Sequence, residues 1–272
     1  MTTAEKRAKE VKLRRGPKVQ RPPVERPPWE REQWIDGGSL RAEAAKAVDR
    51  ATDTTPRRHR AEPGLAPDVA AELAKASKAT DTARLHERLA SAADALDRGR
   101  YADARRMVQP VIKNLPQLAF GHEIAGLCWY RLGEWRKAIT ELELARELDG
   151  SVTHHAVLAD CYRAVKRYHE VERLWSELRA ASPAPSLLAE GRIVAAGALA
   201  DQGDFVGALR TMAKALEVPK RPKDYHLRQW YVVADLYDRS GDVIKARRYF
   251  GLVAEANGSF ADVRERLKTL GR

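Results

Sequence analysis

The sequence contains few cysteines and no long apolar run. Only Cys128 and Cys161 are present in 272 residues, and they show no CxxC spacing, so the chain has no disulfide framework of the kind that small secreted proteins use. No stretch approaches the ~20 apolar residues that a transmembrane helix needs, and no apolar segment follows the first charges of the N-terminus. These absences predict a reduced, cytoplasmic protein whose two cysteines lie in the core.

Motifs of catalysis and cofactor binding are also missing. There is no GxSxG elbow, no GxxxxGK[ST] loop and no GxGxxG followed by a helix. His154 and His155 are adjacent and point about 100° apart on a helix. His154 and Cys161 supply at most two metal ligands, whereas a structural zinc usually takes about four. We expect no enzyme, metal, cofactor or small-molecule substrate; a catalytic site assembled from scattered residues is the alternative.

Positive charge is concentrated in the first fifth of the chain. The formal net charge is +11, and residues 1–60 hold 16 Lys and Arg against 9 Asp and Glu, while the remaining residues hold 33 against 29. A basic segment is attracted to polyanions through counterion release and long-range steering, although basic tails also simply solubilise a protein. The candidate polyanion-binding residues of this tail are Lys6, Arg7, Lys9, Lys12, Arg14, Arg15, Lys18 and Arg21.

The same region is rich in proline and poor in aliphatic residues. Residues 14–35 contain five prolines and many charges, so they bury too little apolar area to offset the entropy of ordering. Trp29 and Trp34 are exceptions that dock either on the protein's own repeats or on a partner. A short helix is expected over 39–52. We therefore predict a disordered basic tail over 1–67, followed by a helical domain over 68–272.

The helical domain contains a pattern that recurs five times. Apolar residues are spaced at three and four residues, as in helices, and no stretch alternates with period two. Successive copies of an alanine-type position are separated by 34, 33, 37 and 38 residues, which is typical of a repeat architecture. That position is Ala104, Ala138, Val171, Ala208 and Ala246, and the turn before it is Gly99, Gly133, Lys166, Gly203 and Gly241.

This pattern resembles the tetratricopeptide repeat family. The family has a small residue and an aromatic on a first helix, Gly-x-aromatic at the turn, and alanine with a large apolar residue on a second helix. Residues 126–145, GLCWYRLGEWRKAITELELA, fit it best. The resemblance implies an all-α, right-handed superhelical solenoid with repeats over about 85–118, 119–151, 152–188, 189–226 and 227–258, and a cap over 260–270.

Three places depart from the regular repeat. Lys166 replaces the turn glycine of the third copy, which predicts a slightly different turn there. The two long intervals arise from PAPS near residue 184 and PKRPKD near residue 220. They predict extended loops or lengthened helices, and insertions of this kind often lie on a working face.

The resemblance also implies that the first helices line a concave groove. Its residues are apolar at one end and acidic at the other, which suits a peptide or helix with hydrophobic anchors, or the chain's own basic tail. The groove lacks the basic residues with which family members bind chaperone tails. Alternatively, Leu127, Tyr130 and Tyr231 are simply packing residues. The groove candidates are Leu89, Glu123, Leu127, Tyr130, Arg163, Ile193, Tyr231, Asp235 and Asp238.

Two functions compete on these grounds. The first is a non-catalytic adaptor or scaffold that binds a peptide or helix segment of another protein in the groove. The second is an RNA- or ribosome-associated factor that is attached through its basic tail. Because the tail lacks the aromatic spacing of a base-stacking surface, it predicts electrostatic attachment only. Neither function involves a membrane.

Overall fold

The computed structural model describes residues 65–76 and 79–271, which all belong to one structural unit. Every regular element within these ranges is a helix, as the sequence predicts. The basic tail, its candidate residues, Trp29, Trp34 and the helix expected over 39–52 lie outside the described residues. None of the helices in the described ranges is long and apolar enough to cross a membrane.

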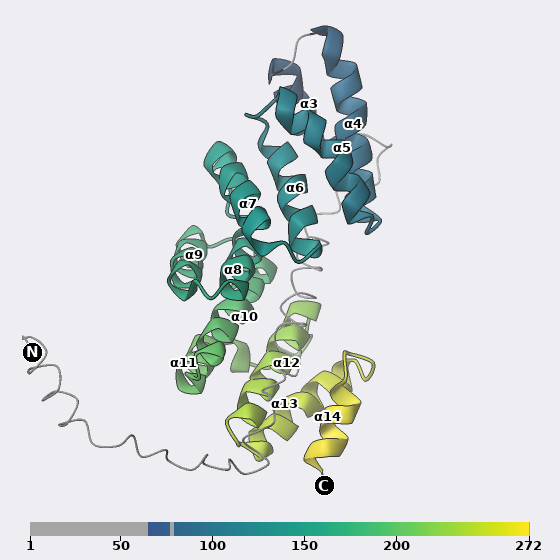
Figure 1. Cartoon of the computed structure of the whole chain (residues 1–272). Helices are drawn as coiled ribbons and strands as arrows, with labels where there is room; N and C mark the ends of the chain where they lie inside the picture. The colour runs from purple at the N-terminus through teal and green to yellow at the C-terminus, as the bar shows by residue number, and fades with distance from the viewer. Residues whose placement is uncertain (1–64, 77–78, 272) are drawn as a thin grey trace, which may run out of the picture. The chain divides into compact units, whose positions relative to one another are not determined.

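The helices form five consecutive hairpins, and each hairpin contacts the next (Figure 1). Helix α3 (Pro67–Ala76) packs on the first hairpin, and α14 (Val263–Leu270) packs on the last. A short 3-10 helix, η2 (Ala213–Leu216), follows the fourth hairpin. The hairpins are α4 (Ala79–Asp97) with α5 (Tyr101–Asn114), α6 (Ala119–Arg131) with α7 (Trp135–Asp149), α8 (His155–Ala164) with α9 (Tyr168–Ala181), α10 (Pro185–Asp201) with α11 (Phe205–Thr211), and α12 (Asp224–Arg239) with α13 (Val243–Ala256).

One turn geometry joins the two helices of every hairpin. Its central residue has a left-handed backbone, with φ between 73° and 85° at the four glycines and 61° at Lys166. The next N–H then bonds to the carbonyl five residues earlier, at 2.8 Å for Arg167 to Tyr162 and 2.8 Å for Asp242 to Tyr237. The expectation of a different turn in the third repeat is therefore wrong. Lys166 adopts the glycine conformation at a steric cost.

Small residues on the first helices allow the second helices to approach closely. At Gly126 on α6, a Cβ atom would lie 2.6 Å from Cγ of Leu142 on α7. The equivalent position in the other hairpins is a buried alanine. Cys128 and Cys161 lie fully buried among these contacts as free thiols. Burial raises the pKa of the Cys128 thiol to about 12, so the thiol stays protonated.

The two insertions lengthen first helices and add loops. Helix α10 begins at Pro185, four residues before the repeat position counted from Ala189. Helix α11 has only 7 residues, and a non-helical segment over 217–223 connects η2 to α12. Because α10 and α12 contact each other, both insertions lie at the N-terminal ends of neighbouring first helices.

Candidate binding surface on the first helices

The first helices α4, α6, α8, α10 and α12 carry all nine residues that the sequence predicts for a groove. Glu123 and Asp238 are partly exposed. The other seven are buried, which fits the packing interpretation of Leu127, Tyr130 and Tyr231. Their exposed fractions are 0% for Leu89, 5% for Leu127, 3% for Tyr130, 5% for Arg163, 1% for Ile193, 2% for Tyr231 and 1% for Asp235.

Buried polar contacts join α6 to α8. The hydroxyl of Tyr130 donates to Oδ2 of Asp160 at 2.9 Å, and Nε2 of His154 lies 3.0 Å from Oε1 of Glu123. Burial raises the pKa of the Tyr130 hydroxyl, and the negative charge of Asp160 raises it further. Tyr130 therefore remains a neutral donor, and two groove candidates contribute to the junction between the second and third hairpins.

A bidentate ion pair joins α8 to α10. Nε of Arg163 lies 2.6 Å from Oδ2 of Asp201, and the second guanidinium nitrogen, Nη2, lies 3.1 Å from Oδ1. Arg163 also lies 3.5 Å from Asp160 on its own helix. Because paired donors fix orientation as well as distance, Arg163 aligns the two helices. Arg163 is only 5% exposed, so its guanidinium pairs with carboxylates of the protein and is not presented to a ligand.

Helices α10 and α12 are joined by an ion pair between Glu190 and Arg228, which are 0% and 2% exposed. Arg192 on α10 also donates to the side-chain carbonyl of Gln229 on α12. A buried pair of opposite charges costs desolvation energy and is tolerated only with good geometry. Glu190 and Arg228 are not among the residues predicted from the sequence, although they lie 38 residues apart, one repeat interval.

The last helix forms ion pairs with the acidic end of the predicted groove. Arg266 on α14 forms ion pairs with Asp235 and, at 3.2 Å, with Asp238. The hydroxyl of Tyr231 donates to Asp262 at the start of the same helix. These three candidates therefore hold α14 against α12, and Arg266 supplies positive charge at the place that the sequence interpretation offered to the chain's own basic tail.

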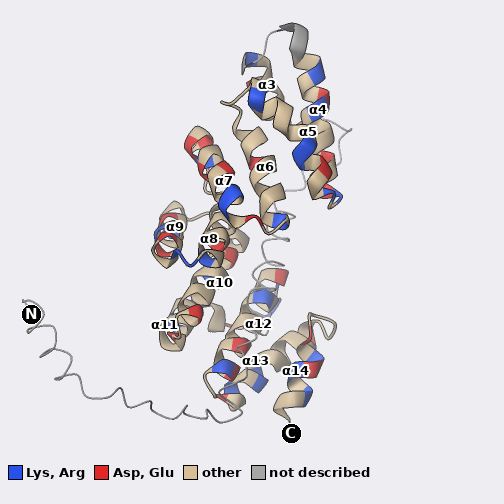
Figure 2. Ribbon diagram, viewed as in Figure 1, with Lys and Arg blue, Asp and Glu red and all other residues tan. Residues whose placement is uncertain are grey.

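A second polar network connects α7, α8 and α9, which carry charges of both signs (Figure 2). Arg146 on α7 bonds to Glu177 on α9 at 2.9 Å, and Tyr162 on α8 donates to Glu143 on α7 at 2.7 Å. His155 contacts Glu177 at 3.0 Å. Glu143 and Arg146 also pair with each other at 2.8 Å on α7, so the network combines a local ion pair with bonds between helices.

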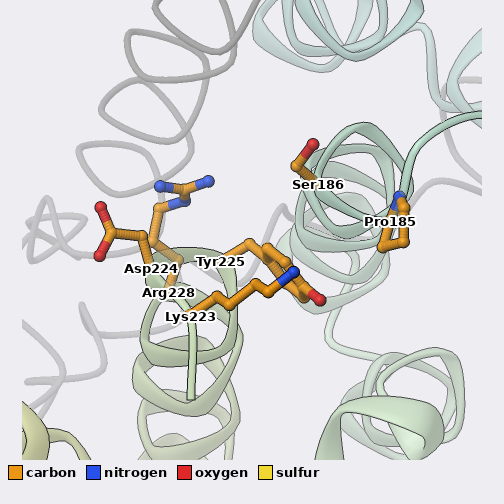
Figure 3. Close-up of a pocket in the computed structure, with 6 residues that line it drawn as sticks. All are labelled: Pro185, Ser186, Lys223, Asp224, Tyr225 and Arg228. Atoms are coloured by element: carbon orange, nitrogen blue, oxygen red, sulfur yellow. The ribbon is translucent and has the colours of Figure 1, made fainter. Parts of the chain in front are cut away.

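A pocket of about 310 Å³ opens between the N-terminal ends of α10 and α12 (Figure 3). None of its residues was predicted as a site residue. The signal for it was present in the two long repeat intervals, since five of the six residues belong to or directly follow the inserted segments. Pro185 and Ser186 line it from α10, and Lys223, Asp224, Tyr225 and Arg228 line it at the start of α12. Within the described ranges, no group of three or more His, Cys, Asp or Glu is placed to hold a metal ion.

Comparison with known proteins identifies the fold. No protein-family model and no curated protein matches the sequence. A thermophilic tetratricopeptide repeat protein of Thermus thermophilus has a TM-score of 0.52 at 18% identity, covering 68% of this chain and 98% of that one. A tetratricopeptide repeat protein of Parabacteroides merdae has a TM-score of 0.53 at 14% identity, covering 89% and 88%. The chain therefore has the tetratricopeptide repeat fold.

Proposed function

We propose that the chain is a non-catalytic adaptor or scaffold that binds a peptide or helix segment of another protein. The observation that carries this proposal is the row of first helices, which buried polar contacts join at every junction from α6 to α14. These contacts hold the helices in place before a ligand arrives, so binding does not have to supply the cost of ordering them. Helical repeat arrays use extended faces of this kind for binding.

The ligand contacts on this face belong to partly exposed side chains of the first helices and not to the buried candidates. Glu123, Arg131 and Asp238 are of this kind and offer both signs of charge. Leu127 and Tyr130 are buried against neighbouring helices. Their substitution would unfold the junction, so it would not report on a ligand. The proposal places the protein in the cytoplasm, where its two free cysteines stay reduced.

Site-specific photo-crosslinking in cells tests the proposal. A photoreactive residue is placed at Glu123 or at Asp238, and the control position is Ile244 on α13, which is 83% exposed. We expect Glu123 and Asp238 to crosslink the same protein and Ile244 not to do so. The purified partner should then bind the purified chain. Crosslinks to the same proteins from Ile244, or to no protein from either first-helix position, would overturn the proposal.

The charge excess of residues 1–60 favours a second function, electrostatic attachment to RNA or the ribosome. It predicts that RNA co-purifies with the full chain and dissociates as salt rises, because phosphate contacts release counterions. Deletion of residues 1–60 should remove that RNA. If RNA and its salt sensitivity survive the deletion, attachment through the tail is wrong.

A further inference from the structure

The pocket between α10 and α12 combines a mainly apolar wall with a buried positive group. Its volume of about 310 Å³ lies at the low end of the range of about 300–1,000 Å³ for ligand pockets, which suits one large apolar side chain. Arg228 lines the pocket and is 2% exposed. Among the described residues, its Nε has no hydrogen-bond partner. The guanidinium is held in place by its ion pair with Glu190.

The N-terminal end of α10 adds further donors to the same place. The helix has 17 residues, its N-cap Ala184 has no side chain that accepts a hydrogen bond, and Pro185 occupies the first turn. The early N–H groups of a helix have no partner within the helix, and they favour negative charge. Ser186, which lines the pocket, belongs to this turn. Oxygen atoms of a ligand are therefore favoured at the wall that α10 forms.

The segment over 217–224, called the rim below, ends at the pocket and carries more positive than negative charge. Lys220, Arg221 and Lys223 are all exposed, while the acidic residues of the same stretch are Glu217 and Asp224. Asp224 also lines the pocket, and Glu190 balances the charge of Arg228. The rim therefore has an excess of one positive charge, and a positive rim steers a negatively charged partner towards it.

We propose that this pocket anchors an acidic segment of a partner protein. A large apolar side chain of the segment fills the pocket, and its carboxylates lie against Lys220, Arg221 and Lys223. The first N–H groups of α10, which have no partner within the helix, bind oxygen atoms of the segment. This inference rests on the proposed scaffold function and specifies the place and the chemistry of the ligand. The basic segment over 1–60 is a poor occupant because its charge has the same sign as the rim.

Fluorescence polarisation with the full chain and labelled short peptides tests the inference. The probes carry a central Trp, Phe or Leu flanked by Glu and Asp. Two control sets replace either the central residue by Ser or the flanking acids by Lys. We expect binding to need both features and to weaken with salt, because charged contacts at an exposed rim are screened. Binding of the Ser-centred or Lys-flanked peptides at equal affinity would overturn the inference.

Two variants locate the site on the chain. Ser186→Trp fills the pocket, and the triple reversal Lys220→Glu, Arg221→Glu, Lys223→Glu inverts the rim; each should weaken binding by about tenfold or more. A second triple reversal at exposed residues of α5, α7 and α11 makes the same change in net charge away from the pocket, and it should leave affinity within about twofold. That control consists of Lys113→Glu, Arg136→Glu and Arg210→Glu.

The outcomes separate this inference from the proposed function. Two results would show a general polyanion surface and overturn the inference. One is an equal loss of peptide affinity in both triple variants. The other is single-stranded RNA that displaces Ser-centred and Trp-centred peptides alike. Markedly tighter peptide binding after deletion of residues 1–60 would assign the pocket to the chain's own tail. If Glu123 and Asp238 crosslink a protein whose binding the pocket variants do not change, the inference fails and the scaffold function stands.

Discussion

The guanidinium of Arg163 on α8 lies against the bare Cα of Gly197 on α10, where a Cβ atom would come within 2.9 Å of Cζ. This close approach allows Arg163 to form its two bonds with Asp201. Gly197 lies four residues, about one helical turn, after the groove candidate Ile193 on α10. The small residue at this position makes room for the arginine of the preceding hairpin.

Gly197→Ala should therefore destabilise the fold, although alanine favours helices over glycine. Displacement of Arg163 should cost about 1–3 kcal/mol, the usual cost of adding volume to a filled core. The matched control is Gly251→Ala on α13, where nothing lies within 4 Å of the added atom, so helix propensity alone should stabilise by about 0.5–1 kcal/mol. Urea unfolding measures both changes. Equal stabilisation of the two variants would contradict the proposed role of Gly197.

Lys166→Gly should stabilise the protein by about 1 kcal/mol, because a non-glycine residue pays about that amount in the left-handed region. Gly203→Lys at the equivalent turn should destabilise it by a similar amount. The unfolding midpoint in urea reports both, and the turn of each variant is expected to remain intact. A loss of stability in Lys166→Gly would show that the lysine side chain contributes more than its backbone costs.

The free energy of unfolding should depend strongly on whether Glu190 and Arg228 are both present. Arg228→Met leaves a buried carboxylate without its positive charge and should cost about 3–5 kcal/mol. The double variant Glu190→Leu with Arg228→Met should be clearly more stable than Arg228→Met alone, because no buried charge remains. A double-mutant cycle measures the coupling. Additive single effects would show that the two side chains act independently.

His154 and His155 should respond to pH in opposite directions. Burial lowers the pKa of His154, but Glu123 and Asp149 outweigh this, so the net pKa is raised above 6.5. The stabilising contribution of His154 is then complete below pH 6.5 and is lost as pH rises through the folded-state pKa. Unfolding free energies of the wild type and His154→Gln should differ more at about pH 5.5 than at about pH 8.5.

The contribution of His155 to stability should change with pH in the opposite direction. Burial lowers its pKa most strongly, the carboxylate of Glu177 raises it, and Arg146 lowers it again, so the net pKa lies below 6.5. The contribution of neutral His155 is present above pH 6.5 and is lost as pH falls through the folded-state pKa. Relative to the wild type, His155→Gln should therefore lose less stability in acid than at neutral pH. Parallel pH profiles for both variants would contradict the assigned environments.

The sequence predicted the hairpins because their residue pattern is local. Helical spacing, the small residues and the turn glycines of each copy specify one supersecondary unit. Lys166 shows the limit of this reasoning. Its intrinsic preference argued for another turn, but the flanking helices and the bond from Arg167 to Tyr162 impose the common geometry. Tertiary contacts thus outweigh a backbone preference of about 1–2 kcal/mol.

The candidate groove was less predictable than the hairpins. The place of a residue within its repeat predicts the helix face on which it lies, but it does not show how near the next helix comes. Tyr130 and Asp160 are 30 residues apart, and Arg163 and Asp201 are 38 apart. Such pairs are separated by about one repeat, so complementary side chains at that interval were a usable signal. The pocket had no such pattern, since five of its six residues belong to or directly follow two insertions of unrelated sequence.

The contacts at the junctions also bear on how the array can evolve. Each junction uses different chemistry: a tyrosine bonded to Asp160, an arginine paired with Asp201, and a glutamate paired with Arg228. Consensus repeats have interchangeable interfaces. A duplicated or transplanted repeat of this chain, in contrast, would bury a charge without the oppositely charged residue of its native neighbour, which costs several kcal/mol. The order and number of the repeats are therefore constrained together, and sequence variation is better tolerated in the loops between them.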